Sequence, residues 1–115
     1  MKQVPQAFQR YFRQLSHEAW STLIQRQEAY GPTNIEQLGV YGVFSRIACD
    51  KMGRIANSLS GELREGKLEV DPGWFNEGTR DALIDIANYA LIMISLGEGK
   101  WSETARAEEP EDFLP

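Results

Sequence analysis

Two carboxylates and an amide interrupt the most apolar stretch of this chain. Asp81, Asp85 and Asn88 lie in RDALIDIANYALIMISLGEG, residues 80–99. Steps of four and three residues put all three side chains on one face of a helix, as a narrow polar stripe on an apolar surface. Asp81 and Asp85 are one turn apart and could share Mg²⁺, which prefers carboxylate oxygens as ligands. The stripe is therefore a candidate metal or ligand site, and the alternative is a thin solvent-facing edge.

An earlier helical segment carries charges that such a stripe would need. Arg46 and Arg54 could form ion pairs with the two aspartates, and two facing stripes would then make a buried ion network that fixes the register of the helices. Lys51 and Arg54 could instead bind phosphates, since arginine makes bidentate contacts and lysine offers a point charge. Spacing alone does not separate the network from a ligand pocket. The candidate ligand-binding residues are Arg46, Asp50, Lys51, Arg54, Asp81, Asp85 and Asn88.

Three helical segments are expected to position these residues. Apolar side chains recur at steps of three and four over residues 5–29 and 34–59, and the stripe lies on a third, nearly all-apolar segment. The second segment is expected to bend at Gly39 or Gly42. A long connection, SLSGELREGKLEVDPGWFNEG, precedes the third helix. The chain is therefore expected to be all-α, a small helical bundle of about three main helices, with its last core helix after this connection.

The charge of the chain is concentrated at its C-terminal end. From Gly97 onward six acidic residues face two basic ones, a net charge of −4, which leaves −1 of the total −5 for the remaining residues. Such a composition is typical of mobile segments. We therefore expect one helical domain over residues 1–97 and a flexible acidic tail over 98–115. The tail ends in EDFLP and is a possible site for a protein partner.

Composition also limits the partners and the location of the protein. Nothing forms a basic footprint for duplex DNA or RNA. The longest apolar run, residues 82–96, is short for a membrane span and is broken by polar residues. Cys49 is the single cysteine, which suits a reducing compartment. We expect a cytoplasmic protein without a membrane anchor, and a homo-oligomer, because a chain of 115 residues builds only a modest core.

A series of short motifs runs through YGPTNIEQLGVYGVFSRIACDKMGRIANSL and the later RDALIDIANYALIMISL. These motifs are Tyr30-Gly31, Gly39 with Gly42-Val43 and Arg46, Asp50-Lys51 with Arg54, and Asp81, Asp85 and Asn88-Tyr89-Ala90. Together they resemble the nucleotide-modification-associated domain, type one, a small domain of bacteria and their phages. The match covers roughly residues 28–97. The resemblance implies a nucleotide ligand, adds Tyr89 to the candidate ligand-binding residues, and implies the host cytoplasm if the chain is encoded by a phage.

That family is similar to the all-α nucleoside triphosphate pyrophosphohydrolases of the MazG type. Those enzymes use Glu-x-x-Glu on one helix and Glu-x-x-Asp on another to bind Mg²⁺, which activates water. This chain departs from the pattern. Its second helical segment offers Asp50 without Glu-x-x-Glu, the spacing of Glu62 and Glu65 falls in the connection, and Ala82 stands where a glutamate would precede Asp85. The resemblance therefore favours nucleotide binding over hydrolysis.

Three functions follow from these patterns. The first is a non-catalytic nucleotide-binding protein, for instance one that sequesters a signalling or modified nucleotide in host–phage conflict. The second is a Mg²⁺-dependent enzyme of nucleotide modification that resembles the pyrophosphohydrolases. The third is an interaction module whose polar seam is structural and whose acidic tail binds a partner. The first ranks highest, because a binder needs cationic and aromatic contacts but no complete metal site.

Overall fold

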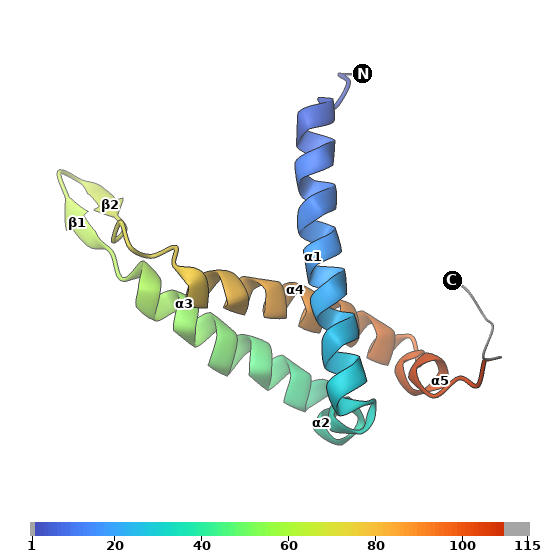
Figure 1. Ribbon diagram of the computed structural model, residues 1–115. Helices are drawn as coiled ribbons and strands as arrows, with labels where there is room; N and C mark the ends of the chain where they lie inside the picture. The colour runs from blue at the N-terminus through green and yellow to red at the C-terminus, as the bar shows by residue number, and fades with distance from the viewer. Residues whose placement is uncertain (1, 110–115) are drawn as a thin grey trace.

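Helices make up most of the structure, a computed structural model that describes residues 2–109. In chain order the main elements are α1 (Gln6–Tyr30), α2 (Thr33–Ser45), η1 (Arg46–Lys51), α3 (Met52–Leu59) and α4 (Glu77–Gly97), followed by the short α5 (Trp101–Ala105). α2, η1 and α3 run on from one another along the side of α4, and α1 crosses these elements near its C-terminal end (Figure 1). The expected all-α architecture with three main helical segments is confirmed.

Glycines at two positions allow the chain to change direction. Gly31 ends α1 with φ 67° and ψ −171°, and its N–H donates to the carbonyl of Gln27. Gly39 has φ 64° and ψ −173° inside α2 and produces a kink. Side chains disfavour such positive φ values, so glycine suits both positions. The bend expected at Gly39 or Gly42 is therefore at Gly39.

The long connection before α4 contains a β-hairpin. β1 (Glu62–Arg64) pairs antiparallel with β2 (Lys67–Glu69), and Glu65 and Gly66 between them both have positive φ. The hairpin projects at the end of the molecule opposite α5 (Figure 1). After a turn closed by Asp71, the side chain of Asn76 accepts a hydrogen bond from the N–H of Thr79 at 2.9 Å and caps α4. This hairpin places α4 antiparallel beside α3.

The buried core is small for a chain of this length. Within residues 2–109 the buried hydrophobic side chains are Ile35, Val43, Ile55, Ala82, Ile92 and Trp101. Helix α1 contributes no buried residue anywhere in Gln6–Tyr30. The radius of gyration is 18.0 Å, whereas a compact domain of this length has about 13 Å. The core therefore lies mainly where α2, α4 and α5 meet, and α1 is only partly packed.

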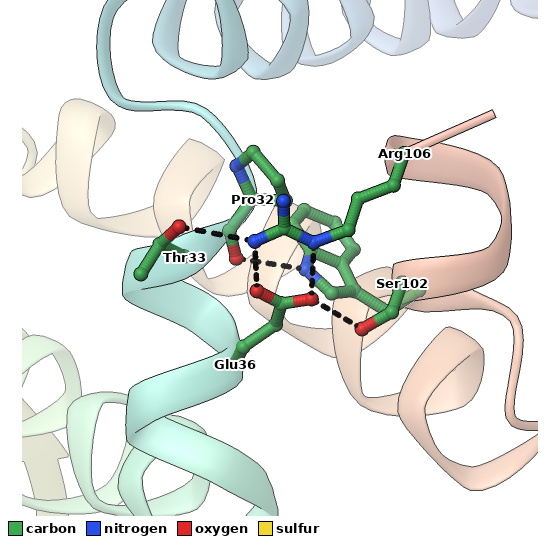
Figure 2. Close-up of polar contacts among 6 residues, drawn as sticks. Pro32, Thr33, Glu36, Ser102 and Arg106 are labelled. Carbon is green, nitrogen blue, oxygen red and sulfur yellow. Dashed lines mark hydrogen bonds and ion pairs between the residues drawn. The ribbon is translucent and has the colours of Figure 1, made fainter. Parts of the chain in front are cut away.

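The ordered domain continues past Gly97. Trp101 in α5 is buried, and its indole N–H donates to the carbonyl of Pro32 at 3.2 Å. Arg106 donates from Nε to the carboxylate of Glu36 at 2.9 Å and from Nη2 to the hydroxyl of Thr33 at 3.1 Å (Figure 2). The boundary expected at residue 97 is therefore too early, because these contacts fasten the segment to the start of α2. Residues 110–115, which include EDFLP, lie outside the described residues.

Acid is expected to weaken this attachment. Hydrogen bonds from Arg106 and Ser102 lower the pKa of Glu36 from 4.5 to about 2. A carboxylate with a depressed pKa contributes stability that is complete above its unfolded pKa and is lost as the pH falls through its folded pKa. Thermal unfolding between pH 5 and about pH 2 should show this loss in the wild type and a smaller loss in Glu36→Gln. Equal slopes for the two proteins would contradict the prediction.

No helix within residues 2–109 combines the length and the apolar character that crossing a bilayer requires.

Candidate functional site

The polar stripe on α4 divides into a buried part and an exposed part. Asp85 and Asn88 are each only 6% exposed, whereas Asp81 is exposed. The buried positions of α4 advance by three residues, from Thr79 through Ala82 to Asp85 and Asn88. The buried face therefore rotates around α4, because its partner changes from α3, contacted through Thr79, to α1, contacted through Asn88. Asp81 lies off that rotating face.

Two cationic side chains from different elements hold Asp85. Nη1 of Arg26, near the end of α1, is 2.8 Å from Oδ1. Nζ of Lys51, at the end of η1, is 3.1 Å from Oδ2. The side chains of Asp85 and Lys51 are 7% and 14% exposed, while that of Arg26 is 50% exposed. Asp85 is therefore a buried carboxylate with an ion pair at each oxygen, one buried and one open to solvent.

The π-helical turn η1 contains one of these two cations. Arg46–Lys51 forms π-helical hydrogen bonds between the α-helical segments α2 and α3. Such turns widen the helix by one residue and occur frequently at functional sites. Here the turn ends at Lys51, whose ammonium group also lies 3.7 Å from Oδ2 of Asp50. The extra residue in this turn changes the helical register, and Lys51 at its end points inward to Asp85.

The residues that form the ion network are not the ones expected. Arg54 pairs with Asp50 on its own helical segment at 3.5 Å, and Arg46 is exposed beside a shallow surface hollow that Tyr89 also lines. The expected pairing of these arginines with Asp85 is wrong, since Arg26 and Lys51 occupy both carboxylate oxygens. Lys51 was a candidate ligand-binding residue. Arg26 was missed, because only the crossing of α1 over α4 brings it to the site.

A cavity of about 100 Å³ opens beside this ion network. Nδ2 of Asn88 donates to the carbonyl of Ala19 at 2.9 Å, but its Oδ1 is buried without a hydrogen-bond partner among the described residues. Buried acceptors without a partner are rare, because desolvation is then uncompensated. The cavity itself is lined by a charged pair, the side chain of Asn88 and aromatic rings. Its lining includes Arg26, Tyr30, Asp85, Asn88, Tyr89 and Trp101.

The residues at this site do not fit a magnesium ion. Both oxygens of Asp85 contact cationic side chains, and the exposed Asp81 lies off the buried face that holds Asp85. Across the described residues no cluster of three or more histidine, cysteine, aspartate or glutamate side chains could hold a metal. Mg²⁺ prefers several carboxylate or water oxygens. The arrangement instead suits a ligand that accepts hydrogen bonds from a cationic side chain.

Comparisons with protein-family models, curated proteins and solved structures found no match to this chain. The resemblance to the nucleotide-modification-associated domain therefore stays a prediction carried by the motifs themselves.

Proposed function

We propose that this chain binds a nucleotide at the cavity beside Asp85 and sequesters it without turnover. One observation carries the proposal. The half-exposed Arg26 meets the buried Asp85 in the lining of a cavity that Asn88 and three aromatic residues, Tyr30, Tyr89 and Trp101, also line. A nucleotide suits such a lining, since phosphate oxygens accept hydrogen bonds from guanidinium groups and aromatic side chains stack on nucleobases.

The phosphate end is assigned to the open side of the cavity. Arg26 uses Nη1 for Asp85, and its half-exposed guanidinium has further donors for a phosphate. A bidentate arginine–phosphate contact is strong and directional. Asp85 orients the arginine, while Lys51 keeps the carboxylate neutralised from the inner side. The positive charge available to a ligand is therefore concentrated at the solvent-facing edge.

The base end is assigned to the aromatic lining. Tyr30 is 69% exposed at the rim and Tyr89 is half-buried deeper in the site. Aromatic faces stack on nucleobases with an energy of about 1–3 kcal/mol per base. The cavity is smaller than the roughly 300–1,000 Å³ of sites that enclose a drug-sized ligand. It therefore takes one part of the nucleotide, and the remainder lies over Tyr30 and Arg26.

Binding without hydrolysis accords with the composition of the site. A pyrophosphohydrolase needs metal-binding carboxylates and an activated water, and the only buried carboxylate here is paired with two cations within the described residues. The chain also lacks the Glu-x-x-Glu and Glu-x-x-Asp pair on its helices. A protein of this kind lowers the free concentration of its ligand and releases it unchanged.

The proposal is tested with a mixed pool of ribo-, deoxyribo- and cyclic nucleotides in the presence of Mg²⁺. The protein should remove one nucleotide class from solution and return it intact after heat denaturation, as read by chromatography and mass spectrometry. Arg26→Ala should weaken binding by about 10- to 100-fold, because a hydrogen bond to a charged group contributes about 1.5–3 kcal/mol. Titration calorimetry with the captured nucleotide measures this change.

Arg64→Ala is the matched control for that substitution. Arg64 is an exposed arginine on β1, away from the cavity, and its loss should leave the affinity unchanged. Conversion of a triphosphate to a monophosphate would replace the proposal with an enzymatic function. If no nucleotide is retained, or if the two arginine variants bind equally well, the proposal is wrong.

A further inference from the structure

The longest helix of the structure leaves its apolar side chains uncovered. Phe8, Tyr11, Phe12 and Trp20 on α1 are 47–57% exposed. The N-terminal half of α1 stands away from the other helices (Figure 1). Its polar contacts with α4 begin only at Glu18, which pairs with Arg80. A helical stretch of about 12 residues without tertiary packing is marginal in water, so this half of α1 needs a covering surface.

A groove in the angle between α1 and α4 continues this uncovered apolar surface. Its volume is about 570 Å³, and its walls are mostly apolar. Tyr11, Leu15 and Trp20 come from α1, Leu83 and Leu91 from α4, and Phe75 from the segment that precedes α4. Monomeric proteins rarely expose contiguous apolar patches of this kind unless they bind something. The groove lies directly beside the projecting half of α1.

We propose that α1 of a second copy of this chain fills the groove, in a two-fold symmetric dimer. An apolar helix and an apolar groove on one chain are self-complementary, so each copy supplies the helix that the other accepts. This proposal rests on the surface alone and is independent of nucleotide binding. One contact would cover both the exposed side chains of α1 and the groove that they partly line.

Charge complementarity favours a second copy over an unrelated helix. Residues 6–17 contain Arg10 and Arg13 but no acidic residue. The first turns of α4 carry the exposed carboxylates of Glu77 and Asp81. An antiparallel pairing of the two α1 helices carries the basic end of one copy toward α4 of the other. Opposite charges at such a rim guide association and fix its register.

The available area reaches the lower limit for a specific dimer interface. The aromatic side chains of Phe8, Tyr11, Phe12, Trp20 and Phe75 are about half exposed. A fully buried aromatic side chain removes about 150–250 Å² from water, so covering these five removes roughly 500 Å² per copy. Two copies then bury about 1,000 Å², the lower limit for a specific interface, before the leucines are counted.

Sedimentation velocity and light scattering test the proposal on the full chain. The wild type should have twice the monomer mass of 13.1 kDa. Trp20→Glu should raise the dimer dissociation constant by about 30-fold or more, as loss of a central interface aromatic does. Leu91→Glu, on the opposite wall of the groove, should have the same effect. Circular dichroism confirms that both variants keep their helices.

Tyr41→Glu is the matched control, because Tyr41 is an aromatic residue on α2 that is 88% exposed and does not line the groove. This variant should remain dimeric. A wild-type mass of 13.1 kDa at all concentrations would overturn the proposal. So would an assembly that persists in Trp20→Glu and Leu91→Glu, or one that dissociates only in Tyr41→Glu.

Discussion

Replacing Asp85 by alanine is expected to lower the free energy of unfolding by about 3 kcal/mol. The substitution leaves the ammonium group of Lys51, whose side chain is 14% exposed, without its nearest counterion at 3.1 Å. Among residues 2–109, Asp50 is then the one carboxylate that remains within ion-pair distance of it, at 3.7 Å. A buried charge that loses its partner retains the cost of desolvation. Urea denaturation should show a lower midpoint with an unchanged m-value.

A double substitution separates the buried pair from the ligand site. Asp85→Leu with Lys51→Met removes both buried charges, and apolar replacement of such a pair is often neutral or stabilising. Arg26 stays hydrated, because its side chain is half exposed. The double variant should therefore regain most of the lost stability and still fail to bind the nucleotide, since Arg26 has lost its orienting carboxylate. A stable double variant that binds normally would make the ion pairs purely structural.

Asp81→Ala provides the control on the same helix. Asp81 lies one turn before Asp85 but is exposed, so its loss should change the free energy of unfolding by no more than about 0.5 kcal/mol. If Asp81→Ala and Asp85→Ala had the same effect, net charge on α4 would explain both results. The double-mutant cycle of Asp85 and Lys51 would then show no coupling, whereas contacting charges are expected to couple.

Local signals predicted much of the fold. The steps of three and four residues predicted the helices, and the bend was expected at Gly39 or Gly42. Each of these features depends on residues near one another in the chain, where spacing determines which side chains share a face. The hairpin lies in a region that the sequence marked only as a long connection, because exposed two-stranded pairs have little hydrophobic alternation.

Which residues form the candidate site depends on how the helices cross. Asp85 and Asn88 were chosen for their spacing and Lys51 for its charge, and Asp85 contacts Lys51 and lines the cavity with Asn88. Arg26 comes from a helix whose polar residues gave no reason to choose one over another. The angle at which α1 crosses α4 brings it to Asp85. A sequence pattern defines the face of each helix but not the level at which two helices meet. Asp81 lies outside the site because the buried face of α4 rotates between its contact with α3 and its contact with α1.

The C-terminal segment shows why average composition is a poor guide to whether a segment packs on the core. Its acidic residues predicted mobility from Gly97 onward. In the part that the structure describes, up to residue 109, one tryptophan and one arginine instead attach the segment to the rest of the protein. Trp101 buries its ring in the core cluster with Ile35, Val43 and Ile92, and Arg106 pairs with Glu36. A few well-placed contacts can order a segment whose mean character is polar, since one large buried aromatic contributes several kcal/mol.

Trp101→Ala is accordingly expected to lower the free energy of unfolding by about 3–4 kcal/mol. The ring is 9% exposed, so its removal leaves a cavity between α2 and α4, and the carbonyl of Pro32 loses its indole donor. The attachment of α5 should then fail, and the contact of Arg106 with Glu36 should be lost with it. Chemical denaturation measures the loss, and hydrogen exchange of the amides of Trp101–Ala105 should become fast in the native state.

Two substitutions show whether this effect belongs to the buried ring. Trp101→Phe keeps most of the apolar volume and removes the N–H group, so it should cost only about 1 kcal/mol from the lost hydrogen bond to Pro32. Glu103→Ala, at an exposed position of α5, should be close to neutral. If all three variants unfolded like the wild type, α5 would be a passive extension of the chain. A graded series would instead make Trp101 the residue that joins the C-terminal segment to the core and completes the aromatic wall of the cavity beside Asp85.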